Sequence, residues 1–259
     1  MRRTVFVLCS MVFPLLLSSC AVIDELLAEQ AVDSTDLSRN EAALFLSVVE
    51  DVLNTMTEEQ MATTTAAQSN QSFPGGCAQA VASGNKVTYV LTQCTGRYGI
   101  SHVNGTMEVT FSKVAGGIKA HLVAPSLKLN QSTLSIDSTA TITFSGQTAT
   151  LAVASQCTGT GPRGNTVAIS GTYGLTFNAE NQCMALQGNW SAEVDSKTWT
   201  LSISNFERCE NACPRDGGKV EFTGGIKDVV VSVQFQGTNQ APWESTRGSS
   251  GTIQLQCGT

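Results

Sequence analysis

The feature that most constrains the fold is a pattern of eleven residues that occurs three times at equal spacing. Residues 101–111, 134–144 and 167–177 align with one another, and successive copies begin 33 residues apart. The third, sixth, ninth, tenth and eleventh positions carry the same kinds of residue in all three copies. A fixed period of this kind is typical of a chain built from repeated structural units.

Apolar and polar side chains alternate within each copy. In the first copy, Val103, Met107 and Val109 fall on one face of an extended strand, and Thr106 and Glu108 fall on the other. This pattern predicts antiparallel strands with one face in water, because a parallel sheet covered on both faces would be apolar throughout. Strands of transmembrane barrels alternate similarly, but the chain has only 3 Trp and 3 Tyr for the aromatic girdles of such a barrel.

Each copy is followed by a turn and a second alternating run, and further runs continue to the end of the chain. We therefore expect a mainly β fold over residues 77–259, an antiparallel meander of about ten to twelve strands. A meander of this length must bury its apolar face, so we expect it to curl into a barrel-like sheet with one N-terminal α-helix packed on it. Apolar residues at three- and four-residue steps predict that helix over residues 36–56. Residues 61–76, rich in Thr, Ala, Gln and Ser, predict a linker.

Charge excludes one class of partner. The formal net charge of −6 argues against nucleic acid, whose binding requires a basic face. Residues 20–60 hold ten acidic side chains and one basic side chain. A solvated acidic helix face accounts for this balance better than an acidic docking surface does.

The first twenty residues have the features of an export signal. Arg2 and Arg3 precede a mostly apolar run over residues 5–17, which is shorter than the about 20 residues that a membrane-spanning helix needs. The run ends in four residues that resemble the lipobox of bacterial lipoproteins: Leu17, Ser18, Ser19 and Cys20. An ordinary cleaved signal, with Cys20 in a disulfide, is the alternative.

The resemblance to bacterial lipoproteins implies that residues 1–19 are a signal peptide and that Cys20 carries the lipid. It implies cleavage before Cys20, a diacylglycerol on the thiol and acylation of the new amine, which together suffice for stable anchoring. Ala21 follows the cysteine, and the resemblance then implies delivery to the outer membrane. Residues 20–76 would be a tether, the acidic amphipathic helix and the linker.

Seven further cysteines follow, and an exported protein meets an oxidising compartment in which disulfides form. An odd count predicts three disulfides and one remaining thiol. We expect Cys77 to pair with Cys94 across a short segment, and Cys157 to pair with Cys183. The remaining three cysteines compete for the last disulfide, and their spacing does not support a zinc site. The seven are Cys77, Cys94, Cys157, Cys183, Cys209, Cys213 and Cys257.

The sequence has no recognisable catalytic, metal-binding or cofactor motif. The two histidines, His102 and His121, fall on the polar side of the alternation. Three carboxylates, those of Glu108, Asp137 and Asp195, could act in hydrolysis only if folding brought a pair of them together. We therefore expect no catalytic residues, no metal and no cofactor.

Two segments read as loops that could contact a ligand. Residues 207–218 carry Arg208 and Arg215 between cysteines and turn residues, and residues 237–251 carry Trp243 among small polar residues. Solvated arginines and a tryptophan folded back over the sheet edge are the alternatives.

Together these features predict a lipid-anchored envelope lipoprotein that is not an enzyme and binds an apolar or a carbohydrate ligand. A structural or interaction role in the outer membrane without a ligand cavity is the first alternative, and a secreted-type hydrolase is the second. The identity of the ligand or protein partner is not encoded in any of these patterns.

Overall fold

The computed structural model describes residues 56–67, 76–95, 102–161, 163–209, 212–224, 229–255 and 257. These residues form one helix and one antiparallel sheet of 13 strands. The helix is α4 (Glu58–Ala67). The strands are β1 (Ala78–Ser83), β2 (Lys86–Cys94), β3 (Val103–Val114), β4 (Gly117–Leu129), β5 (Ser132–Ser145), β6 (Thr148–Thr160), β7 (Thr166–Asn178), β8 (Cys183–Val194), β9 (Lys197–Arg208), β10 (Lys219–Gly224), β11 (Val229–Gln234), β12 (Gln240–Ser245) and β13 (Ser250–Gln254).

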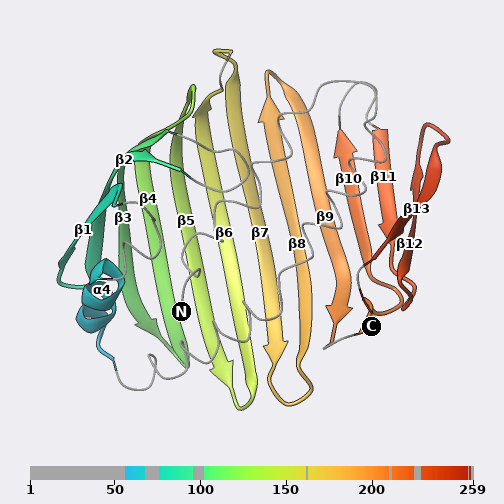
Figure 1. Ribbon diagram of the computed structural model, residues 1–259, viewed down its shortest axis with the longest axis horizontal. Helices are drawn as coiled ribbons and strands as arrows, with labels where there is room; N and C mark the ends of the chain where they lie inside the picture. The colour runs from blue at the N-terminus through green and yellow to red at the C-terminus, as the bar shows by residue number, and fades with distance from the viewer. Residues whose placement is uncertain are drawn as a thin grey trace.

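The sheet is a meander in which every strand pairs with its neighbours in sequence, in the order β1 to β13 (Figure 1). The mainly β, antiparallel prediction is confirmed, with one strand more than the expected upper number. The hairpin β12–β13 begins at Gln240 and ends at Gln254, so it overlaps residues 237–251, which the sequence predicted to be a loop. These two short strands were not predicted because their sequence is rich in small polar residues and does not show a clear alternation of apolar and polar side chains.

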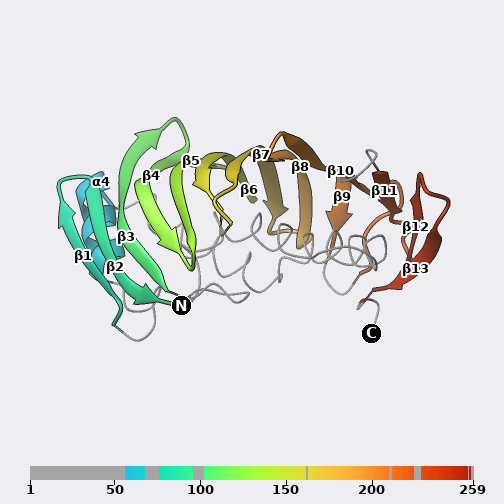
Figure 2. The same ribbon diagram turned by 90° about the horizontal axis from the view of Figure 1, so that it is seen from above.

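Seen from above, the sheet curves into an arch (Figure 2). It is open rather than closed, because β1 and β13 stand at the two ends of the strand order. The expected barrel-like curl is therefore present without closure.

Burial follows the alternation that the sequence predicted. In β5, Leu134, Ile136 and Ala140 are buried, and Ser135 and Asp137 between them are exposed. The three copies of the eleven-residue pattern lie in β3, β5 and β7, so each copy supplies every second strand. The sheet thus has an apolar face and a polar face.

The buried side chains of the apolar face gather into two clusters. The first extends from β1 to β7 and includes Val87, Tyr89 and Met107. The second extends from β5 to the C-terminal strands and includes Phe206 and Phe235, whose rings meet edge to face with centroids 5.2 Å apart.

The helix α4 packs on the apolar face at one end of the sheet, where Met61 and Ala62 are buried. A reciprocal capping box begins it: the Thr57 backbone N–H donates to Oε1 of Gln60 at 2.8 Å, and the Gln60 N–H donates to Oγ1 of Thr57 at 3.2 Å. The linker prediction is therefore wrong for residues 61–67, because this cap and the contact with the sheet stabilise a helix of modest intrinsic propensity. The helix expected over residues 36–56 lies outside the described residues apart from Met56.

Three disulfides lie near the ends of strands, and the predicted count is confirmed. Cys77 bonds Cys94, as predicted, and joins the edge strand β1 to β2. Cys183 bonds Cys209 and joins β8 to the end of β9. Cys213 bonds Cys257 and joins the β9–β10 connection to the chain beyond β13.

The predicted pairing of Cys157 with Cys183 is wrong. Cys157 lies in the middle of the apolar face, opposite Ile136 and Ile169 on the adjacent strands, and it is buried. Cys183 begins β8 and lies beside Cys209 at the end of β9. Cys157 therefore keeps its thiol within the core.

Candidate functional site: a polar groove across the central strands

Two parallel rows of side chains, all polar except Ala154, cross the polar face of the central strands. The strand register places one residue of each strand opposite one residue of the next. Row 1 consists of Thr139, Ala154, Thr172, Asn189 and Ser202, and row 2 consists of Asp137, Gln156, Ser170, Ser191 and Thr200. In each strand the two members are two residues apart, so their side chains leave the sheet on the same side.

The space above these rows is a groove of about 620 Å³ that is open to solvent. All ten row residues line it. The other four lining residues lie between the two rows, at positions that belong to the apolar face, and their backbone contributes the floor: Ser155, Gly171, Trp190 and Leu201. We refer to this site as the polar groove.

Packing beneath the floor fixes the central strands. The rings of Trp190 and Tyr173 stack on the apolar face with centroids 5.7 Å apart. A Cβ at Gly171 would collide with the indole of Trp190, and one at Gly188 would lie 2.6 Å from the Cβ of Tyr173. The two glycines therefore leave the room that the indole occupies.

A pair of hydroxyls continues this support toward β5. The Oγ atoms of Ser138 and Ser155 lie 2.6 Å apart, and Ser138 is buried. The pair satisfies two polar groups on the mainly apolar face. The floor of the polar groove is thus backed by rings on β7 and β8 and by a hydrogen bond between β5 and β6.

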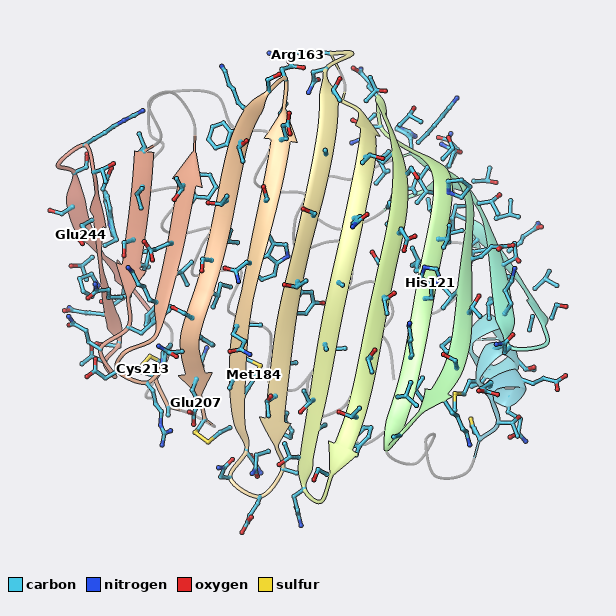
Figure 3. The ribbon with its side chains drawn as sticks, turned by 180° about the vertical axis from the view of Figure 1, so that it is seen from behind. His121, Arg163, Met184, Glu207, Cys213 and Glu244 are labelled. Carbon is cyan, nitrogen blue, oxygen red and sulfur yellow. A yellow bond between two sulfur atoms is a disulfide. The ribbon has the colours of Figure 1, made fainter. Side chains whose placement is uncertain are left out.

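The electrostatic character of the polar groove is nearly neutral. Asp137 is the one ionisable side chain among its lining residues. Its Oδ1 lies 2.8 Å from Nε2 of His121 on β4, and both side chains are substantially exposed. His121 is labelled on the face of the sheet that Figure 3 shows. The rest of the lining consists of hydroxyls, amides and small side chains, and hydroxyls and amides both donate and accept hydrogen bonds.

The candidate contact residue Trp243 does not lie in an exposed loop, and the structure agrees with the alternative, a tryptophan folded over the sheet edge. Trp243 belongs to β12, is only 8% exposed and packs in the second core cluster. Its ring covers Gly251 of β13, where an added Cβ would lie 2.7 Å from the indole Nε1. The tryptophan is therefore part of the core at the sheet edge.

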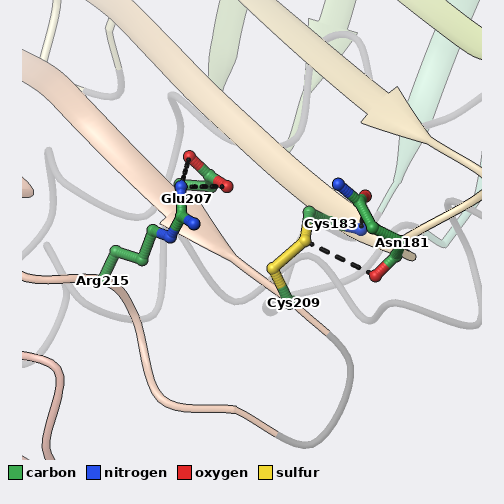
Figure 4. A network of polar contacts seen from close by, with 5 residues as sticks. All are labelled: Asn181, Cys183, Glu207, Cys209 and Arg215. Atoms are coloured by element: carbon green, nitrogen blue, oxygen red, sulfur yellow. Dashed lines mark hydrogen bonds and ion pairs between the residues drawn. A yellow bond between two sulfur atoms is a disulfide. The ribbon is translucent and has the colours of Figure 1, made fainter.

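The two predicted arginines stabilise the stretch that follows β9. Arg208 donates from Nε to the carbonyl oxygen of Ala212 at 3.2 Å. Arg215 pairs with Glu207, with Nη1 at 2.8 Å from Oε1 and 2.9 Å from Oε2 (Figure 4). Neither arginine lines the polar groove, which ends at Ser202 on this strand.

The same region brings together the Sγ atoms of Cys183 and Cys209 and the carboxylate of Glu207, within 4.8 Å of one another. Both sulfur atoms are in one disulfide (Figure 4). A disulfide supplies no thiolate, and metal binding by cysteine requires the thiolate. The group therefore fits a disulfide-stabilised strand end and not a metal site.

The three carboxylates considered for hydrolysis lie in different places. Glu108 pairs with Lys86 at 2.9 Å, and Asp137 pairs with His121. Asp195 accepts the N–H of Thr166 at 3.2 Å in the turn between β8 and β9. The other histidine, His102, is exposed, and its Nδ1 lies 2.6 Å from Oε1 of Gln93. None of the six positions on β8 and β9 that line the polar groove carries an acid or a base.

Sequence reasoning did not identify the polar groove as a site, although a signal for it was present. On β5 and β7 its residues are the fourth and sixth positions of the second and third copies, namely Asp137, Thr139, Ser170 and Thr172. The alternation assigns these positions to the polar face. Only the register between strands aligns them with their partners on β6, β8 and β9.

Comparison with known protein families, curated proteins and solved structures finds no match for this chain. No helix among the described residues is both long enough and apolar enough to cross a membrane. The lipobox-like segment that ends at Cys20 lies outside the described residues.

Proposed function

We propose that the protein is an outer-membrane lipoprotein that binds carbohydrate through the polar groove and has no catalytic role. The observation that carries this proposal is the nearly neutral array of hydroxyl and amide groups along rows 1 and 2. A sugar ring presents several hydroxyls, each of which donates and accepts, and such an array can satisfy them without burying a charge.

The apolar alternative has less support. An apolar ligand would need apolar side chains that are open to it. The described residues of the two core clusters are instead buried, with Val87, Val220 and Val233 fully enclosed. These side chains already remove their surface from water by packing with one another, so they support the fold rather than a ligand site.

A non-catalytic role is supported by the chemistry of the lining. General acid–base catalysis needs at least one positioned group whose pKa suits proton transfer. Asp137 is paired with an exposed histidine, and the row residues of β6 to β9 are neutral. Glycoside hydrolysis would need a second carboxylate across the polar groove, and the lining has none.

Binding can be tested with one variant and a matched control. Asn189→Ala removes an amide from row 1, between Thr172 and Ser202, and Gln187→Ala removes an amide two residues along β8, outside the lining. We expect wild type to bind at least one glycan on an array, Asn189→Ala to bind it at least about fivefold more weakly, and Gln187→Ala to bind normally. Equal loss in both variants, or binding to no glycan, would contradict the proposal and favour the structural role.

The lipid anchor is tested separately, in cells that export the protein. We expect Cys20→Ala to abolish incorporation of labelled palmitate and association with the membrane fraction. Cys157→Ala provides a control that removes another cysteine without breaking a disulfide or changing the lipobox-like segment. Unchanged fractionation of Cys20→Ala would refute the lipoprotein assignment and leave the binding proposal intact.

A further inference from the structure

The polar groove is much longer across the strands than along them. It covers five strands, β5 to β9, and therefore four intervals between adjacent strands. At about 4.8 Å per interval this is about 19 Å, whereas rows 1 and 2 are only about 7 Å apart along a strand. A ligand that uses the whole groove must be elongated, and its long axis must run across the strands.

Charged residues border the neutral stretch at both ends. On one side, beyond β4, the Nζ of Lys86 on β2 pairs with the carboxylate of Glu108 on β3 at 2.9 Å. On the other side, the Nζ of Lys219 pairs with Glu221 at 2.8 Å on β10, the strand next to β9. Glu221 lies directly opposite Ser202, the last member of row 1. Ion pairs therefore flank the strands of the polar groove on both sides.

The one ionisable side chain that lines the groove is Asp137, at its β5 end. The carboxylate is 63% exposed, and its partner is His121 on β4. No lysine or arginine lines the groove. A ligand with carboxylate groups would meet a like charge there and would find no basic partner along rows 1 and 2.

We infer that the ligand is an extended, uncharged polysaccharide segment that lies across β5–β9, and that Asp137 discriminates against carboxylated polymers. This inference rests on the proposed carbohydrate binding and adds the charge, direction and length of the ligand. Each pyranose ring lengthens an extended polysaccharide chain by about 5 Å, which is close to the distance between adjacent strands. Roughly four rings would therefore occupy the groove.

The experiment is affinity gel electrophoresis with three neutral polymers, namely dextran, hydroxyethylcellulose and laminarin, and the carboxymethyl derivative of each. Wild type, Asp137→Asn and Glu193→Gln are compared. Glu193 is an exposed carboxylate of the polar face on β8 outside the groove, so its variant makes the same change of charge elsewhere. Oligosaccharides of two, four and six units from the retarding polymer are then used as competitors.

We expect a neutral polymer to retard the wild type more than its carboxymethyl derivative does. Asp137→Asn should strengthen binding of that derivative by about threefold to tenfold at low salt, with a smaller gain at high salt, and Glu193→Gln should not. Competition should improve from two units to four and change little from four to six. Preference for the carboxymethyl derivative, or competition that is independent of length, would overturn the inference while leaving carbohydrate binding intact. Retardation by none of the polymers would refute the proposed function itself.

Discussion

The two faces of the central strands are formed by alternate residues of the same strands, yet they serve different purposes. On β6, Val153 and Cys157 are buried in the apolar face, whereas Ala154 and Gln156 line the polar groove. On β9, Leu201 and Ile203 are buried, and Thr200 and Ser202 line the groove. The comparison teaches that stability and recognition are separated by a single residue step, because the side-chain period of a strand is two. Substitutions one residue apart should therefore have different consequences.

The largest difference is expected on β9. Phe206→Ala empties a site that is 1% exposed and removes the edge-to-face contact with Phe235, so we expect a loss of about 3–5 kcal/mol in the free energy of unfolding. Thr200→Ala on the polar face should cost less than about 1 kcal/mol. Denaturant titration followed by circular dichroism measures both. Similar losses in the two variants would show that the faces do not differ in this way.

A smaller and more specific difference is expected between two glycines of β7. Gly171→Ala places a methyl group against the indole of Trp190 on the apolar face, and we expect a loss of about 1–3 kcal/mol. At Gly174 the new Cβ would lie 3.8 Å from Cγ of Gln187, an ordinary contact on the polar face, so Gly174→Ala should be neutral or slightly stabilising. The midpoint of thermal unfolding distinguishes the two. A harmless Gly171→Ala would mean that the indole can move aside.

The smallest effect concerns a titratable group of the apolar face. Burial raises the pKa of Tyr89 to about 12. The unfolded chain loses this proton near pH 10 and the folded chain keeps it, so stability should fall as the pH rises from about 10 toward 12. Tyr89→Phe should show a shallower fall between pH 9 and 11 in urea titrations at each pH. Parallel curves for wild type and variant would indicate that Tyr89 ionises with an ordinary pKa.

The fold could be predicted from the sequence largely because alternation is a local property. Each copy of the eleven-residue pattern shows which side chains are buried without any knowledge of the neighbouring strands, and Ile136 and Ile169 are buried as expected. The helix α4 escaped prediction because its residues have little apolar periodicity, and contact with the first core cluster stabilises it.

The candidate site could not be predicted because it depends on register. Thr172 becomes a neighbour of Ala154 and Asn189 only through the pairing of three strands. Dependence on the arrangement of strands also explains which disulfides could be predicted from the sequence. Cys77 and Cys94 are close in sequence and were paired correctly, whereas Cys213 and Cys257 meet through the arrangement of β10 to β13. For Trp243 the sequence leaves an exposed and a buried position open, and only the hairpin that β12 makes with β13 decides for the buried one.

The nearest-neighbour pairing of the meander has a consequence for how such a protein can change over evolutionary time. No strand depends on a partner that is distant along the chain, and one copy of the 33-residue period corresponds to one hairpin of two strands. Gain or loss of a hairpin within β4–β9 would alter the span of the arch while leaving every other pairing in place. The reach of the recognition surface could thus be lengthened or shortened in steps of two strands by duplication or deletion.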